Sequence, residues 1–596
     1  MDTSSTHYLC LAAALAQSYS IQQPIPVTIE QLTGILCCTP RNVKFILRRL
    51  EEQALIEWVP GRGRGNYSQL TLLRGRDEVL EELFQDMVSK GNMKSATQLM
   101  AEYPVSEPLK DRLLAVLDKQ MGLRSEPDSA SGQEVLRISR NRSMEKLDPA
   151  TVYTAFETYL LGHICSTLIT YDAQSRVFQP GLAHTWEYNE SRTSYLFYLR
   201  KGVRFHHGRM MTSRDVKETL QRLINFGSPA ACHFKDIAHV ELESDYRIRF
   251  DLRQPNLFFL HLFSSIYMSI LPYDADFSQH PVGTGPYQVL DLSSDVLVLG
   301  AFDFYYGIRP LLDRVEIWYL PHLASSVRQY QLKDASTGQG QGGLTAAEEV
   351  QGHSIEYPSL GCRYILFNFR RAGVHHQLAI RQALRILYSP LALIRELGGS
   401  RSLPADSFLP WRSSGHLFTE PLLEEAKALL QAGGYRGEEV KLAYRTRKEE
   451  QDEALWLLER SRKIGLKLEL YPVTEYDLPE LIDHADLFIC EEVLEDDWQW
   501  GMINYFHNES NYLHDLLLDS QKLALAEILA PFSRLTEGER AELLNLAEDK
   551  LRANCWVLYG CHMNKQAQFS QSLFGLEVGA FGFLDISKLW VKPEFQ

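Results

Sequence analysis

Residues 28–55 read TIEQLTGILCCTPRNVKFILRRLEEQAL and predict two short helices joined by a tight turn. Thr28 and Gln31 form a capping-box pattern, in which the two side chains satisfy amides of the first helical turn. Thr39 and Pro40 mark the second start, because Thr is a good N-cap and Pro is pre-organised for the first turn. The apolar residues of the second helix recur at three- and four-residue spacing and are expected to face a small core: Val43, Ile46, Leu47 and Leu50.

The opposite face of the second helix is basic and polar. Two helices in this arrangement can place the second one in a DNA major groove. Arg41, Asn42 and Lys44 are the base-edge candidates, since Arg suits guanine and Asn suits adenine. The DNA-binding residues predicted on this helix are Thr39, Arg41, Asn42, Lys44 and Arg48.

A glycine-arginine loop follows the helices. Residues 60–66, PGRGRGN, separate two predicted strands, 56–59 and 67–73. Arg62, Arg64 and Asn66 would lie at the tip, where a wing contacts phosphates or a minor groove. A solvated hairpin with a basic face is the alternative interpretation, but the order and spacing of all these pieces favour DNA binding.

Charge is unevenly distributed along the chain. The 596 residues carry a formal net charge of −15 and predict two or three domains. Residues 1–76 contain eight Lys and Arg against five Asp and Glu, a net of +3, which leaves −18 for the remainder. A basic head on an acidic body is typical of a DNA-binding unit carried by a domain with another task.

The sequence favours a cytoplasmic protein without membrane contact. We expect no signal peptide, because no basic region precedes the apolar residues 9–16, and no apolar run is long enough to span a bilayer. The nine cysteines form no C-x-x-C pair, so free thiols in a reducing compartment are expected.

We divide the chain into four segments. Residues 1–76 form the winged helix-turn-helix domain, and residues 77–121 a helical segment that is either a dimerisation element or a connector. Residues 122–134 are predicted to be a linker, because they are rich in Ser, Gly and charge. Residues 135–596 alternate strands and helices, as in an α/β or α+β body of at least two lobes.

Several motifs of this body resemble those of one family. Residues 198–208, YLRKGVRFHHG, together with 179–183, QPGLA, and 281–287, PVGTGPY, are similar in sequence and order to the family 5 extracytoplasmic solute-binding proteins. With the preceding winged helix, the chain resembles the SgrR-type transcriptional regulators. The resemblance implies an α-rich winged helix-turn-helix followed by a two-lobed α/β periplasmic-binding-protein-like domain of type II. Residues 283–287 are expected to form a turn whose glycines adopt positive φ.

The resemblance also indicates where a ligand binds. In peptide-binding relatives an acidic residue near a strand end in the second lobe meets the ligand's amine, and this chain has an acidic group there. A solvated acidic loop is the alternative interpretation, and the departure from the peptide-transport pattern near Trp498 speaks against a peptide ligand. The predicted ligand-binding residues are Tyr364, Asn368, Trp411, Arg412, Glu492, Glu495, Asp496 and Trp498.

These expectations define a one-component sensor. Its partners are a double-stranded DNA operator and a small-molecule effector, a sugar, sugar phosphate or peptide-like solute, and it would control transport or metabolic genes, as a homodimer if residues 77–121 mediate dimerisation. The alternative is the solute-binding receptor of an ABC transporter. No G-x-S-x-G, H-E-x-x-H or P-loop indicates an enzyme, and no cofactor is expected. His206 and His207 lack further metal ligands at a usable spacing.

Overall fold

The computed structural model describes most of the chain in two compact units. The described residues are 3–15, 22–61, 67–103, 105–119, 121–126, 133–140, 144, 147–152, 154–278, 280–320, 331–332, 353–415, 418, 422–474, 476–509, 511–569, 573–578 and 580–591. The first unit comprises residues 1–143, 291–298 and 314–350, and the second comprises residues 144–290, 299–313 and 351–596.

The first unit begins with the predicted helix-turn-helix. It contains α1 (Thr3–Leu15), α2 (Ile29–Leu36) and α3 (Pro40–Glu52). Both halves of the Thr28 and Gln31 capping box are present, and the Thr39 hydroxyl accepts a hydrogen bond from the backbone of Asn42 at the start of α3. The four apolar residues predicted to face the core of α3 are all buried, which confirms the periodicity.

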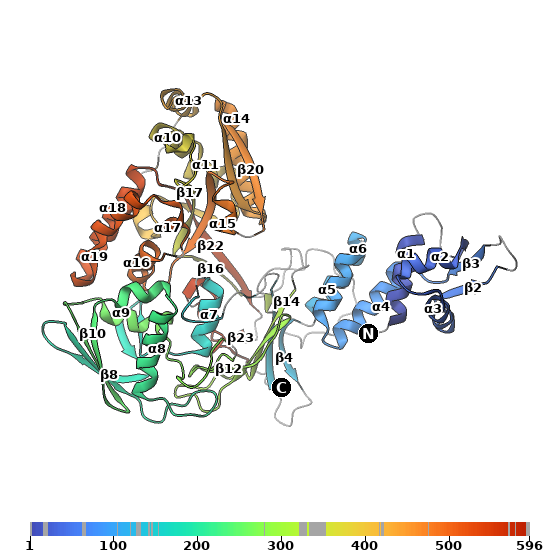
Figure 1. Cartoon of the computed structure of the whole chain (residues 1–596), viewed down its shortest axis with the longest axis horizontal. Coiled ribbons are helices and arrows are strands. Elements are labelled where there is room, and N and C mark those ends of the chain that lie inside the picture. The colour runs from blue at the N-terminus through green and yellow to red at the C-terminus, as the bar shows by residue number, and fades with distance from the viewer. Residues whose placement is uncertain are drawn as a thin grey trace. The chain divides into compact units, whose positions relative to one another are not determined.

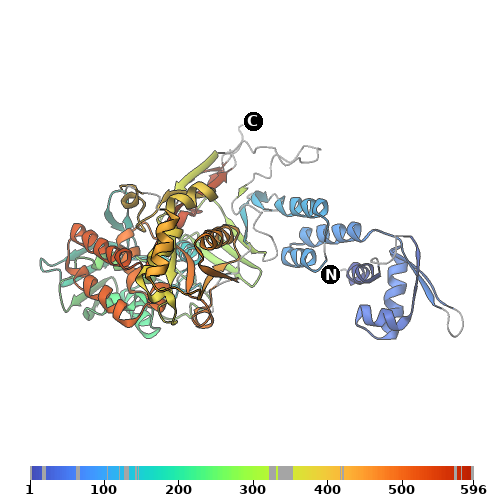
Figure 2. The ribbon, with the colours of Figure 1, turned by 90° about the horizontal axis from the view of Figure 1, so that it is seen from above.

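A three-stranded antiparallel sheet completes this domain. The predicted strands are β2 (Ile56–Val59) and β3 (Ser68–Leu72), and β1 (Pro24–Val27) pairs with the other edge of β3. Figure 2 shows the β2–β3 hairpin extending from the helices α1 to α3. Strand β1 was not predicted from the sequence, and its two prolines are tolerated because it lies at the edge of the sheet.

Three further helices continue the core of the first unit. They are α4 (Arg76–Ser89), α5 (Met93–Glu102) and α6 (Glu107–Asp118). One cluster of buried side chains runs from Leu32 and Val43 of the helix-turn-helix to Phe84 of α4 and Leu113 of α6. These helices therefore share a core with the winged helix instead of standing apart from it.

The predicted linker contains a strand. Residues of β4 (Gly122–Glu126) pair antiparallel with β5 (Gln133–Arg140), so the linker prediction was wrong for 122–126. Strand β5 also pairs in parallel with β14 (Arg314–Tyr319), in a sheet of order β12-β13-β14-β5-β4 that includes β12 (Tyr287–Leu292) and β13 (Val296–Ala301). A segment distant in sequence supplies the partner strand, and local composition carries no signal for such pairing.

The first half of the second unit spans residues 144–290 and 299–313. Its antiparallel sheet has the order β10-β11-β9-β8, and β6 and β7 form a separate hairpin. The bounds are α7 (Ala155–Ile164), β6 (Ile169–Asp172), β7 (Val177–Pro180), β8 (Ala183–Tyr188), β9 (Ser194–Leu199), α8 (Ser213–Asn225), β10 (Ile237–Ser244), β11 (Arg247–Leu252) and α9 (Phe259–Ser264).

The PVGTGPY segment differs from its prediction in one respect. Gly283 and Gly285 are not among the residues of positive φ. Glycine is required there by close packing, because a Cβ on Gly283 would lie 2.1 Å from the carbonyl oxygen of Ile164, and one on Gly285 2.4 Å from that of His163.

The second half spans residues 353–569 and is built on a mixed sheet. Its central order is β22-β17-β21-β19-β20, with β16 and β18 also paired to β22, and α14 packs on β19 and β20 (Figure 1). Its strands are β16 (His353–Pro358), β17 (Gly361–Phe367), β18 (Arg401–Pro404), β19 (Glu439–Arg445), β20 (Lys467–Val473), β21 (Leu487–Val493) and β22 (Val557–Phe569).

Helices surround this sheet. They are α10 (Leu378–Leu387), α11 (Pro390–Leu397), α12 (Pro410–Ser413), α13 (Leu423–Ala432), α14 (Lys448–Ile464), α15 (Leu478–Leu481), α16 (Trp498–His507), α17 (Tyr512–Leu516), α18 (Asp519–Leu529) and α19 (Glu537–Ala553). Residues after β22, including β23 (Leu573–Phe574) and β24 (Trp590–Val591), return the chain to the first half, where the Tyr159 hydroxyl donates to the Leu584 carbonyl over 2.6 Å. The chain thus passes between the halves more than once, as expected for a two-lobed α/β body.

Candidate functional site

The exposed face of α3 is the first candidate site. Arg41, Asn42 and Lys44 are exposed, and within the described residues neither Arg41 nor Lys44 forms an ion pair. Arg48 is also exposed, but its Nε lies 3.0 Å from a carboxylate oxygen of Glu52. Thr39 caps the helix, which makes its side chain a structural element of the site.

One residue of this face has no place in the sequence-based prediction. Phe45 is 65% exposed. At roughly 100° per residue, its side chain points about 150° away from the mean direction of the four buried positions of α3. It therefore lies near the centre of the exposed face, between Arg41 and Arg48. The signal was present in the sequence, since Phe45 breaks the apolar spacing of this helix.

The wing tip was predicted between β2 and β3. Arg62, Arg64 and Asn66 lie outside the described residues. Their flanking strands β2 and β3 are present in the predicted order.

The second candidate site lies where the two halves of the second unit meet. Nδ1 of His261 in α9 lies 2.5 Å from Oδ2 of Asp497, which caps α16. The backbone amide of Leu257 donates to the Ser533 carbonyl over 2.7 Å, and the rings of Phe258 and Phe532 are 4.9 Å apart. The two halves are thus in contact along α9, α16 and the short 3-10 helix Phe532–Arg534 that precedes α19.

Acidic side chains gather beside this contact. Burial raises the pKa of Glu492 to about 8, with a further contribution from Glu491. Burial also raises the pKa of Glu495 to about 8, and Asp497 adds to the rise. The pKa of Asp496 is raised by burial as well, although part of its side chain is exposed. In the part of the chain that the structure describes, no basic group forms an ion pair with Glu492 or Glu495.

Polar and aromatic groups of both halves surround these carboxylates. Nε1 of Trp500 donates to Glu495 over 3.2 Å. Tyr267 from the first half hydrogen-bonds Asn504, and burial followed by the charges of Glu495 and Glu492 raises its pKa. Oδ1 of Asn504 is buried without a hydrogen-bond partner among the described residues. The site is therefore rich in oxygen atoms that can accept hydrogen bonds.

A histidine pair borders the same region. The ring of His233 lies 4.9 Å from that of Trp500 and 5.6 Å from that of His507. Burial lowers the pKa of His233 to about 3 and that of His507 to about 4, so both rings are neutral at pH 7. Nε2 of His233 is buried and lacks a partner within the described ranges.

The remaining predicted ligand residues divide into two sets. Trp411 and Trp498 come together, with ring centroids 5.9 Å apart, and Trp411 is 50% exposed. The hydroxyl of Tyr505 donates a hydrogen bond of 3.0 Å to that of Tyr364. Burial and the charge of Glu492 raise the pKa of Tyr505.

Arg412 and Asn368 are engaged in the protein itself. Arg412 pairs with the buried carboxylate of Glu548, so its guanidinium is already neutralised. The amide nitrogen of Asn368 donates to the carbonyls of Ile482 and Ala485, and its oxygen accepts from two backbone amides. These contacts are those of fold-supporting side chains.

The described residues offer neither a metal site nor a membrane span. No group of three or more His, Cys, Asp or Glu side chains there could hold a metal ion. Among those same residues, no helix has the length and apolar composition to cross a membrane.

Comparison with protein families gives two matches. Residues 177–507 match the bacterial extracellular solute-binding proteins, family 5, in the middle region of that family. Residues 10–126 match the N-terminal domain of the sugar transport-related sRNA regulator. The resemblance to SgrR-type regulators seen in the sequence is confirmed, and so is the fold class.

Individual relatives agree with these matches. The YhjP protein of Bacillus subtilis is 28% identical over 98% of this chain and 99% of its own length. The HTH-type transcriptional regulator SgrR of Yersinia enterocolitica is 29% identical over 62% of this chain, an alignment that spans 63% of that regulator.

Solved structures share the fold of the larger domain. NikZ from Campylobacter jejuni, in complex with Ni(L-His), has a TM-score of 0.63 at 18% identity and covers 77% of this chain and 99% of its own. The Escherichia coli murein tripeptide binding protein MppA has a TM-score of 0.62 at 18% identity, with 77% and 98% covered.

Proposed function

Because the chain belongs to family 5 of the bacterial extracellular solute-binding proteins, we propose that its second unit binds a small solute and thereby controls DNA binding by the first. The protein would act as a cytoplasmic transcriptional regulator of transport or metabolic genes, not as an enzyme. The observation that carries this proposal is the presence, in one chain, of a winged helix with an exposed Arg41, Asn42 and Lys44 and of a two-lobed body with an acceptor-rich site. If the protein were only the receptor of a transporter, the winged helix would have no role.

The chemistry of the second site indicates the class of solute. Glu492 and Glu495 lack a counter-charge among the described residues, and Asn504 offers a buried acceptor. With pKa values of about 8, both carboxyl groups hold protons at pH 7. A bound cation would favour their ionised form and gain an ion pair, whereas a bound phosphate would meet no described positive charge there. An effector with an ammonium group or several hydroxyls suits this site better than a phosphorylated one.

Closure of the two halves supplies the link to DNA. A solute that contacts Glu495 of one half and Tyr267 of the other binds the closed form more tightly than an open one. Coupling between two such sites is typically about 1 to 3 kcal/mol. Few basic residues line α3, so one copy should bind DNA weakly, and a homodimer would supply the missing phosphate contacts.

The experiment that tests the proposal uses the full chain. Duplexes selected from a random pool should bind more tightly than unselected ones, and amine- and hydroxyl-bearing metabolites should change that affinity by roughly fivefold or more. Failure to enrich any duplex would overturn DNA-directed function. Enrichment without an effect of any solute that binds the chain would overturn the sensor mechanism.

A further inference from the structure

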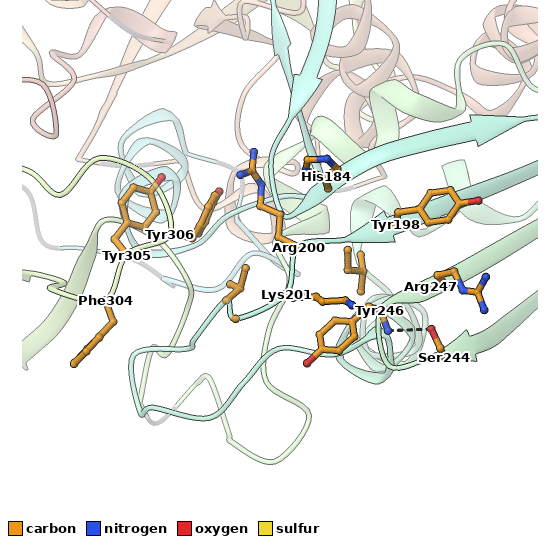
Figure 3. A pocket seen from close by; sticks show the side chains of 13 residues that line it. His184, Tyr198, Arg200, Lys201, Ser244, Tyr246, Arg247, Phe304, Tyr305 and Tyr306 are labelled. Atoms are coloured by element: carbon orange, nitrogen blue, oxygen red, sulfur yellow. Dashed lines mark hydrogen bonds between the residues drawn. The ribbon is translucent and has the colours of Figure 1, made fainter.

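A hollow whose chemistry differs from that of the acidic site lies in the first half of the second unit (Figure 3). It has a volume of about 860 Å³. It forms at the turn after β9, beside the β10–β11 turn and residues 304–306. Its lining includes Arg200, Lys201, Arg247, Tyr246 and Tyr306.

The charge of this hollow is positive. Arg200, Lys201 and Arg247 line it, and no carboxylate does so among the described residues. Neither Arg200 nor Lys201 forms an ion pair with a described carboxylate, and Nε of Arg247 is 3.8 Å from Glu243, which also pairs with Arg249. Arg200 and Lys201 are therefore two cations without a described counter-charge in a chain of net charge −15.

Aromatic rings lie beside two of these cations. The guanidinium carbon of Arg200 lies 5.6 Å from the centre of the Tyr306 ring, and Nζ of Lys201 lies 5.8 Å from that of Tyr246. Nε of Arg200 donates to the Gly181 carbonyl over 2.6 Å, which fixes the guanidinium, and Figure 3 shows Arg200 between Tyr306 and His184. Cations positioned on aromatic faces present their N–H groups to an anion, while the rings accept a flat ligand group.

We propose that this hollow binds a small phosphate monoester whose phosphate is attached to a ring. The phosphate meets Lys201, and the ring packs on Tyr246. Its volume suits one small molecule, since ligand pockets are about 300 to 1,000 Å³. The site is separate in residues and opposite in charge to the Glu492 and Glu495 site, and it does not depend on DNA binding. Nucleotides and sugar phosphates share this chemistry.

Calorimetric titration of the full chain with phenyl phosphate, inorganic phosphate and phenol tests the proposal. We expect saturable binding of phenyl phosphate, weaker binding of inorganic phosphate and none of phenol. Lys201→Glu should weaken phenyl phosphate binding at least tenfold. The control is Lys217, an exposed lysine of α8 that does not line the hollow. Lys217→Glu should change the affinity for phenyl phosphate by less than twofold. Titration with adenosine 5′-monophosphate and with glucose 6-phosphate then shows whether the hollow prefers a nucleotide or a sugar phosphate.

Two further variants separate the contributions. Tyr246→Leu should weaken the binding of phenyl phosphate at least threefold and leave the binding of inorganic phosphate unchanged, because it removes a ring but no charge. Glu492→Gln should leave the affinities for phenyl phosphate and inorganic phosphate unchanged. Absence of saturable phenyl phosphate binding by the wild-type chain, or binding that survives both Lys201→Glu and Tyr246→Leu, would overturn the proposal.

Discussion

Nδ1 of His261 lies 2.5 Å from Oδ2 of Asp497, and this contact joins the two halves of the second unit. The side chains are only 8% and 10% exposed, so solvent screens the interaction little. His261 also stacks on Phe258, with ring centroids 4.2 Å apart. The pair is therefore a candidate latch for the closed form.

His261→Phe should weaken closure, because it keeps the stacking but removes the hydrogen bond. Asp497→Asn retains an oxygen that can cap α16 and removes the charge. A double-mutant cycle from urea unfolding should give a coupling of about 1 to 3 kcal/mol, the range for hydrogen bonds to charged groups. Small-angle scattering should show a larger radius of gyration for either variant without solute. Additive effects in the cycle would remove the latch from the mechanism.

Glu492 and Glu495 should make stability depend on pH. Their pKa values of about 8 in the folded state exceed the ordinary value of 4.5. The folded chain therefore holds protons that the unfolded chain loses, and the free energy of unfolding should fall as pH rises from about 4.5 through 8. The combined variant Glu492→Gln, Glu495→Gln should flatten this decline in urea titrations at pH 6 and 9. An unchanged slope would show that other groups titrate there.

Arg41→Ala should reduce sequence discrimination. Loss of a bidentate base contact costs about 1 to 3 kcal/mol on a selected duplex and little on random DNA. Arg436→Ala, an exposed arginine of the second unit, is the matched control and should change neither affinity. Arg62→Ala is expected to weaken all sequences alike. Equal losses on both DNAs for Arg41→Ala would make it a phosphate contact instead.

Phe45→Ala should remove a preference for thymine. An exposed aromatic at the centre of a groove-facing helix can pack on the C5-methyl group of thymine. Replacing thymine by deoxyuracil in a selected duplex should weaken wild-type binding about fourfold per contacted methyl, from ~0.8 kcal/mol per buried carbon.

The thymine-to-deoxyuracil ratio should fall to about one in Phe45→Ala. Leu523→Ala, a similarly exposed apolar residue of α18, should keep the wild-type ratio. If wild-type binding does not distinguish the two bases, DNA binding stands but Phe45 has no role in reading sequence. A change in sedimentation of Phe45→Ala would instead assign the ring to contact with a second copy.

Local patterns in the sequence were sufficient for the winged helix and for the family of the larger domain. Capping residues such as Thr28 and Thr39, and the spacing of Val43, Ile46, Leu47 and Leu50, act within one or two turns, so their structural effect is readable from the chain itself. The same holds for the family motifs, which are contiguous.

Only the tertiary structure decided which distant groups meet. It paired Arg412 with Glu548, brought His261 to Asp497 across 236 positions, and placed Lys201 on the ring of Tyr246. It also placed Glu492 and Glu495, both half-buried, where no cation pairs with them among the described residues. Burial and charge pairing depend on contacts between segments far apart in sequence, whereas helix caps and periodicity depend on near neighbours. For that reason the sequence by itself determined the kind of protein, and the structure decided what each site can bind.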